Sequence, residues 1–153
     1  MMTSHHAGPG PDPATFSERI AFSVRGDPAP QGSKKGWVVK GRVVMSESSK
    51  KLKPWRALVA DCLSAAMVAG NLQAIEGPVS VALTFRRRKP KSYPKLKPTW
   101  PITAPDVDKL ARAVLDALSG IAIRDDAQVV RLLAEKMWGE PGVDVLVESW
   151  RVL

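Results

Sequence analysis

The apolar residues of this 153-residue chain follow two different periods, and the change from one to the other limits what the chain can fold into. Apolar side chains alternate with smaller ones over residues 79–85, which predicts a strand with one buried face. Over residues 107–118 they recur every three or four positions and stop at Gly120, which predicts a helix. A chain of this length is expected to fold as one domain that contains both kinds of element.

The same two patterns recur on either side of this central pair. Further strands are predicted at residues 19–24, 129–133 and 143–150, a hairpin at 37–45, and a helix from Trp55 to near Gly70. Residues 1–17 are rich in Pro, Gly, Ser and Thr and lack periodic apolar side chains, so we expect a disordered tail there. The folded domain is then expected to span residues 18–153.

The charge balance indicates the kind of partner. Lys and Arg number 23 against 15 Asp and Glu, a formal net charge of +8 that is typical of a protein that binds a polyanion. Nucleic acid is favoured over a membrane, because no apolar run approaches the roughly 20 residues of a membrane span and no amphipathic basic helix stands out. The single cysteine, Cys62, is typical of a reducing compartment, and we expect a cytoplasmic protein.

Two basic segments are candidate DNA-contacting surfaces. One is the Pro- and Gly-rich stretch before the hairpin. The other is residues 86–97, which contain no acid and in which Pro90 and Pro94, followed by Pro98, prevent regular structure. Tyr93 and Trp100 could stack on unpaired bases, although Trp100 could instead anchor the loop to the core. The alternative for every lysine and arginine here is an ordinary solvated surface. The residues predicted to contact DNA are Lys34, Lys35, Arg86, Arg87, Arg88, Lys89 and Lys91.

Acidic residues gather where the rest of the chain is basic. Five aspartates fall between residues 106 and 126, namely Asp106, Asp108, Asp116, Asp125 and Asp126. Clustered carboxylates repel one another unless a cation or basic side chains neutralise them. Asp106 just before the helix and Asp108 just inside it can share one ion, and the return from Gly120 is expected to bring Asp126 back to the start of the helix. Such a set suits Mg²⁺ or Mn²⁺.

Each of these residues also has a plainer interpretation. Asp106 could be an ordinary helix N-cap, worth about 1 kcal/mol, and Asp108 could simply favour the positive end of the helix dipole. Asp108, Arg112 and Asp116 are spaced to project from one helix face. Arg112 is therefore either an intrahelical ion-pair partner or a clamp for the scissile phosphate. Asp116 is expected to orient other groups rather than bind the ion.

The order and spacing of these residues resemble those of a known family. Residues 105–120 are PDVDKLARAVLDALSG, and residues 123–130 are IRDDAQVV. The family pattern is Asp-x-Asp-Asn-Leu-x-Lys, then Asp-Ala-Leu, then Asp-Asp-x-Gln-Val. The chain resembles the RusA family of Holliday junction resolvases, most closely over residues 105–137 and more loosely from residue 19.

The resemblance implies a fold, a cofactor and a reaction. The fold would be α+β, a small mixed sheet flanked by helices, and the protein would be a homodimer. Asp106, Asp108 and Asp126 would bind Mg²⁺, with Mn²⁺ as a possible replacement. The substrate would be branched DNA, a four-way junction whose opposed strands are nicked symmetrically.

The chain departs from the family pattern at two positions. Arg112 stands where the family has its catalytic lysine, and Lys109 stands where it has asparagine. Arginine does not readily give up its proton, so Arg112 is expected to stabilise charge rather than act as a general acid. Lys136 lies on the strand after the Asp-Asp pair, where the family also places a basic residue. Lys109 and Lys136 are therefore added to the residues expected to contact DNA.

Two other functions remain open from the sequence. The chain could be a DNA-binding protein without activity, which would bind junctions and not cut them. It could also be a metal nuclease that prefers flaps or forks, which only competition between substrates would separate from a resolvase. Other hydrolase or nucleotide-binding chemistry is not supported, since the sequence has no phosphate-binding Gly-rich loop and no Cys-x-x-Cys pair.

Overall fold

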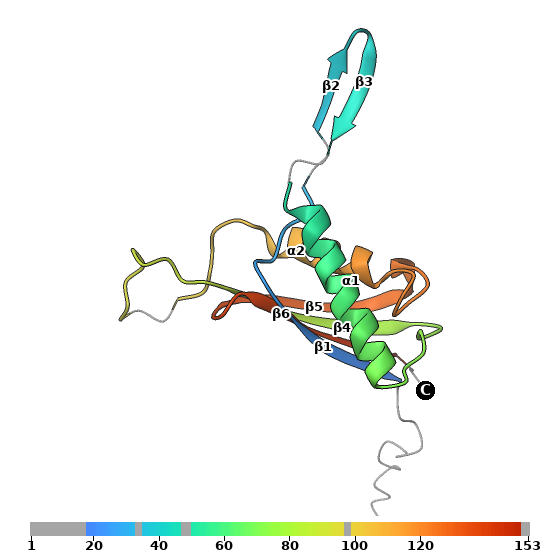
Figure 1. Cartoon of the computed structure of the whole chain (residues 1–153). Helices are drawn as coiled ribbons and strands as arrows, with labels where there is room; N and C mark the ends of the chain where they lie inside the picture. Colours follow the sequence, from blue (N-terminus) through green and yellow to red (C-terminus); the bar gives the residue numbers. More distant parts are fainter. Residues whose placement is uncertain (1–17, 33–34, 47–49, 97–98, 151–153) are drawn as a thin grey trace, which may run out of the picture.

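A four-stranded mixed sheet forms the centre of the molecule. The structure, a computed structural model, describes residues 18–32, 35–46, 50–96 and 99–150, so the predicted tail at 1–17 lies outside the described residues. The strand order is β1 (Arg19–Arg25), β6 (Gly142–Ser149), β4 (Val79–Arg87) and β5 (Val129–Trp138) (Figure 1). β6 is antiparallel to both of its neighbours, whereas β4 and β5 are parallel. The predicted α+β fold with a mixed sheet is confirmed.

Two helices cover one face of this sheet. α1 (Leu52–Ala69) buries Leu52, Trp55, Val59 and Leu63, and α2 (Val107–Leu118) buries a stripe centred on Leu110, Val114 and Leu118. These side chains form one core with the alternate buried residues of β1, β4 and β6. Small side chains flank the stripe of α2, at Ala111, Ala113 and Ala117, and they allow the helix to lie close to its neighbours. The core therefore fixes α2 against the sheet.

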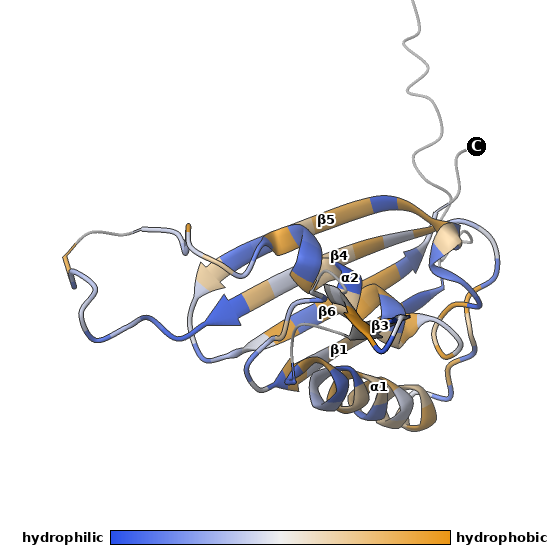
Figure 2. Ribbon diagram, turned by 90° about the horizontal axis from the view of Figure 1, so that it is seen from above, coloured by the Kyte–Doolittle hydropathy of each residue, from blue (hydrophilic) through white to orange (hydrophobic). Residues whose placement is uncertain are grey.

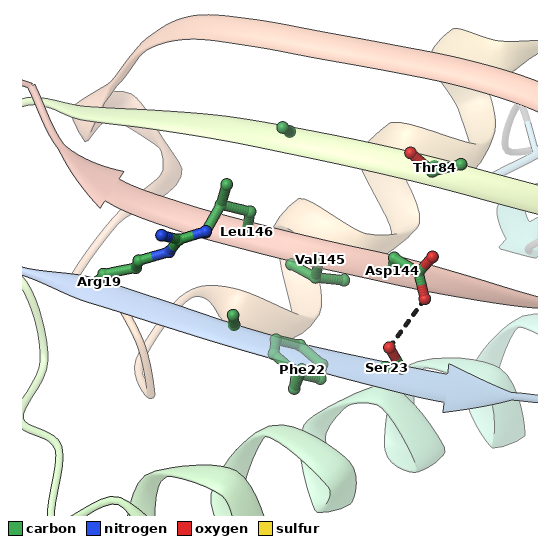
Figure 3. A pocket seen from close by; sticks show the side chains of 9 residues that line it. Arg19, Phe22, Ser23, Thr84, Asp144, Val145 and Leu146 are labelled. Atoms are coloured by element: carbon green, nitrogen blue, oxygen red, sulfur yellow. Dashed lines mark hydrogen bonds between the residues drawn. The ribbon is translucent and has the colours of Figure 1, made fainter.

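The opposite face of the sheet has no covering element among the described residues. It carries small, polar and apolar side chains, including Ser23, Thr84 and Leu146, and contains a shallow hollow of about 440 Å³ (Figure 3). Ser23 donates a hydrogen bond of 2.7 Å from its Oγ to Asp144 at the end of this hollow. Arg86 donates to the same carboxylate and also to the carbonyl oxygen of Glu140, at 3.2 Å.

The predicted hairpin is present and projects away from the sheet (Figure 1). It consists of β2 (Lys35–Val39) and β3 (Arg42–Ser46), with Lys40 and Gly41 at positive φ in the turn. The paired side chains of Val38 and Val43 are each 70% exposed. The described residues of the hairpin do not belong to the core, and the hairpin projects into solvent away from the sheet and helices (Figure 1).

The predicted elements are confirmed, with three differences. β4 and β5 run further than the apolar alternation indicated, to Arg87 and Trp138, because the mutual backbone pairing of two parallel strands continues past the point where charged side chains interrupt the pattern. A 3₁₀ helix, η1 (Asp126–Gln128), precedes β5 and was not predicted. All three differences alter where the site residues lie.

The ion pair between Arg86 and Asp144 predicts a pH dependence of stability. The hydrogen bond from Arg86 holds the pKa of Asp144 below its usual value. A carboxylate with a lowered folded-state pKa stabilises the fold above its unfolded pKa of about 3.9, and this stabilisation is lost as the pH falls through the folded value. Asp144→Asn should therefore lower the unfolding free energy by roughly 0.5–1 kcal/mol near pH 7, a range typical of partly exposed pairs, and by less below pH ~4.

Urea unfolding of both proteins across this pH range measures the difference. Glu148→Gln on the same strand is the control, with an expected change within about 0.5 kcal/mol. A deficit in Asp144→Asn that stays constant down to the lowest pH would show that the ion pair is not its source.

Candidate active site

The first pair of candidate ligands lies at the start of α2. Asp106 occupies the N-cap position with extended backbone angles, but its side chain makes no capping hydrogen bond. It is instead 59% exposed, and its Oδ2 lies 3.5 Å from the Nζ of Lys109. Asp108 is exposed in the first turn. Asp106 is therefore not an ordinary side-chain cap, and both carboxylates are accessible to a cation.

The residues just before α2 are held by two cations from the sheet. We call residues 99–105 the lead-in segment. Arg87 at the end of β4 donates to the carbonyl oxygen of Ala104 at 2.7 Å. The Nζ of Lys136 on β5 lies 3.0 Å from the carbonyl oxygens of both Thr103 and Pro105. Three consecutive carbonyl groups are thus bound by cationic side chains immediately before Asp106.

The second pair of acids lies in the turn that leads into β5, where the two aspartates have different roles. Asp125 is the N-cap of η1, and its side chain accepts a hydrogen bond of 2.7 Å from the backbone N–H of Ala127. Asp126, the next residue, is exposed. The cap explains why two adjacent acids are present: Asp125 shapes the turn and leaves Asp126 available as a ligand.

Gln128 fastens this turn to the rest of the fold. Its Oε1 accepts hydrogen bonds from the backbone N–H groups of Arg124, at 2.7 Å, and Asp125, at 3.1 Å. Its Nε2 donates to the carbonyl oxygens of Ile75, at 3.0 Å, and Gly77, at 2.9 Å. One amide side chain therefore makes four hydrogen bonds and joins the Asp126 turn to the segment that precedes β4.

The electrostatics of Asp126 indicate which acids lie near it. Partial burial raises the pKa of Asp126, and a hydrogen bond with Asp125 and the negative charges of Asp125 and Asp116 raise it further. Asp116 belongs to the C-terminal half of α2, where its Oδ2 lies 3.6 Å from Arg56 on α1. A cation placed beside Asp126 would relieve this repulsion.

The two pairs of acids lie toward opposite ends of α2 within one chain, whereas the sequence led us to expect Asp126 at the start of the helix. The return from Gly120 leads Asp126 toward the C-terminal half of α2, where the charge of Asp116 acts on it, because β5 starts there and reaches the lead-in segment only at Lys136. Twelve helical residues span about 18 Å. Among the described residues, no group of three or more His, Cys, Asp or Glu is arranged to hold a metal ion.

The sequence left two roles open for Arg112, an ion-pair partner within the helix or a clamp for a phosphate, and the structure bears on the first. The Arg112 side chain is exposed on α2, and no ion pair joins it to Asp108 or Asp116 in the part of the chain that the structure describes. Asp116 pairs with Arg56 of α1 instead. The charge of Arg112 is therefore available for an anion.

The predicted DNA-contacting residues fall into two groups. Arg86, Arg87 and Lys136 are half-buried and bound to groups of the fold, as described above. Arg88 and Lys91 are exposed, and Arg88 lies 3.4 Å from Glu140. Lys34 lies outside the described residues, and the backbone of Lys35 begins β2.

The two aromatic residues of the β4–α2 loop differ in their surroundings. Tyr93 makes an edge contact with Trp138, with ring centroids 5.3 Å apart, and the Nζ of Lys89 lies 5.2 Å from the Tyr93 centroid. Tyr93 is thus part of the base of the loop. Trp100 is 62% exposed, so it does not anchor the loop to the core. The loop extends from the sheet and is largely hydrophilic (Figure 2).

Exposed carboxylates can hold a divalent cation that polarises a phosphate ester, and a strongly basic chain attracts the phosphates of nucleic acid. Residues 25–148 match the family model described as Endodeoxyribonuclease RusA. The chain belongs to this family of nucleases, which act on branched DNA, and the resemblance noted in the sequence is confirmed. No helix in the described ranges is long and apolar enough to cross a membrane.

A relative from Bacillus subtilis (strain 168) shares this sequence over most of its length. It carries the name "Uncharacterized protein YqaN" and is 35% identical over 142 residues, which cover 85% of this chain and 96% of the relative. The similarity therefore extends well beyond the short acidic motif.

The hydrogen bonds of Gln128 predict a large effect from one substitution. Gln128→Met keeps the length of the side chain but leaves two backbone N–H groups and two carbonyl groups without their partner. We expect a loss of about 2 kcal/mol in unfolding free energy, measured by urea denaturation. Gln73→Met, at an exposed glutamine, is the matched control and should change stability by less than about 0.5 kcal/mol. Equal effects of the two changes would contradict the role given to Gln128.

Proposed function

We propose that the protein is a Mg²⁺-dependent endodeoxyribonuclease that resolves four-way DNA junctions by paired symmetric nicks. The observation that carries the proposal is the set of accessible carboxylates at both ends of α2, within a chain that belongs to the RusA family. DNA recombination and repair is the corresponding process, and the proposed location of the protein is the cytoplasm.

The donor chemistry of this set fits a hard divalent cation. Asp106, Asp108 and Asp126 provide only carboxylate oxygens, which suit Mg²⁺ or Mn²⁺ and leave room for water and phosphate oxygens. Burial raises the pKa of Asp126 most, and the negative charges of Asp125 and Asp116 raise it further; a bound cation would relieve that repulsion. When bound, the ion supplies Lewis acidity to the phosphoryl group and lowers the pKa of a water ligand.

The basic residues of α2 have distinct tasks in this proposal. Arg112, one turn beyond Asp108, pairs with the scissile phosphate and stabilises the charge that develops on it. Lys109 lies beside Asp106 and can exchange that carboxylate for a neighbouring phosphate of the DNA. Arg88, Lys89, Lys91 and the projecting hairpin supply contacts to the phosphates of the arms, for which shape and charge matter more than base sequence.

A homodimer would bring together the two pairs of acids that lie far apart within one chain. A two-fold axis that crosses α2 near its middle would place the Asp106 end of one protomer by the Asp126 end of its partner, and each site would then draw on both chains. β5 is an edge strand of the sheet (Figure 2). Its Val130, Leu132 and Leu133 side chains are 59%, 45% and 60% exposed. An unpaired strand edge with exposed apolar side chains is a natural surface for a second copy.

A nicking assay tests the activity. Labelled four-way junction and linear duplex are incubated with the protein in Mg²⁺ or in EDTA. We expect paired symmetric nicks on the junction alone, lost in EDTA, and reduced at least ~100-fold by Asp108→Asn because a ligand is removed. Asp61→Asn removes an exposed acid from α1 and should leave cutting unchanged.

The same assay separates the other candidate functions. Tight junction binding without cutting in Mg²⁺ or Mn²⁺ would leave a DNA-binding protein without activity. Preferred cutting of flaps or forks in direct competition would replace the resolvase by a different structure-selective nuclease.

The proposed dimer predicts a coupling between assembly and metal binding. Leu133→Asp places a charge on the exposed edge of β5, so it should change the stability of the protomer by no more than about 0.5 kcal/mol. It should shift sedimentation from dimer toward monomer and weaken Mn²⁺ binding in titration calorimetry in parallel. A monomeric variant that binds Mn²⁺ as the wild type does would show that each protomer holds its ion alone.

A further inference from the structure

The lead-in segment has no regular secondary structure, yet cationic side chains bind three of its carbonyl groups. Residues 99–105 contain no helix or strand, so their carbonyl groups have no partner from secondary structure. Three of them in succession, those of Thr103, Ala104 and Pro105, accept hydrogen bonds from Arg87 and Lys136. A cationic donor makes a stronger hydrogen bond to a carbonyl group than a neutral donor does.

The two donors come from the same end of two paired strands. β4 and β5 are parallel, and in their register Phe85 lies opposite Lys136 and Arg87 opposite Trp138. Both side chains therefore reach out from the carboxyl ends of two paired strands. These hydrogen bonds fix the position of the lead-in segment relative to the sheet.

What this fixes is the position of Asp106. Asp106 follows Pro105 directly, and its carbonyl oxygen accepts the first hydrogen bond of α2, from the N–H of Leu110 at 3.1 Å. Pro101, near the N-terminal end of the lead-in segment, is buried and anchors that end by apolar packing. Movement of residues 103–105 would carry the Asp106 carboxylate and the first turn of α2 with it.

We propose that Lys136 and Arg87 are positioning residues that clamp the lead-in segment and so aim Asp106 and Asp108, and that neither contacts DNA phosphate. The assignment rests on the proposed function for its catalytic consequence, whereas the clamp itself does not. It changes the role expected of both residues from the sequence, and it separates them from Arg88 and Lys91, whose side chains are exposed.

Lys136→Met is the principal test, because methionine keeps the length of the side chain and removes its donors. Lys91→Met on the exposed loop is the matched control. Hydrogen–deuterium exchange followed by mass spectrometry reports on the amides of residues 99–110 without DNA or metal. We expect roughly tenfold faster exchange at the start of α2 in Lys136→Met, no change there in Lys91→Met, and recovery of most protection in Lys136→Arg.

Junction binding in EDTA across a range of salt concentrations then distinguishes a clamp from a phosphate contact. Loss of one phosphate contact lowers the slope of log K against log salt by about one. We expect that reduction for Lys91→Met and an unchanged slope for Lys136→Met. In Mg²⁺, Lys136→Met should lower kcat about tenfold with KM for the junction within twofold of the wild type, because only the ligands have moved.

The outcomes separate this inference from the proposed function. Unchanged exchange at residues 103–110 together with a reduced salt slope in Lys136→Met would overturn the clamp and make Lys136 a DNA contact. If the wild type cut no DNA at all, the exchange result would still decide the clamp. If Lys136→Met did not fold, the Nζ resonance of Lys136 in the wild type would decide, since junction DNA in EDTA should shift the Lys91 signal and leave that of Lys136 in place.

Discussion

The parallel pairing of β4 and β5 is the constraint on which the rest of the site depends. Two parallel neighbours cannot be joined by a hairpin, so the chain must leave the end of β4, cross the sheet and return to the start of β5. α2 makes that crossing and runs opposite to both strands. The acids that precede α2 and those that precede β5 are consequently held at opposite ends of one helix. Arg87 and Lys136, at the carboxyl ends of the two strands, lie beside the lead-in segment that precedes this helix.

Positive charge has two uses in this molecule, which the net charge of +8 does not reveal. Arg86, Arg87 and Lys136 neutralise or bind groups of the fold itself, at Asp144 and at backbone carbonyls. Arg112 and Lys91 remain exposed to solvent. A run such as Arg86-Arg87-Arg88 therefore combines adjacent residues with different tasks, because successive side chains of a strand point to opposite faces and the strand ends within the run.

The sequence predicted the elements better than their relations. Apolar periodicity located both helices and every strand, and the acidic motif identified the family. It did not predict that Gln128 reaches Ile75 and Gly77, or that Lys136 reaches Thr103, since these contacts join residues far apart in the chain and depend on which strands pair. One local signal for the unpredicted 3₁₀ turn is present in the sequence: Asp125 and Gln128 have the spacing of a capping box.

The distance between the two ends of α2 has a consequence for a cell that makes such a nuclease. If each site needs the acids of two chains, a newly synthesised protomer carries only half of every site and is harmless to the chromosome. Cutting would then rise with the square of protein concentration while protomers are scarce, and would become linear only once pairs predominate. The geometry of a single helix would in this way set a threshold of expression below which the enzyme is silent.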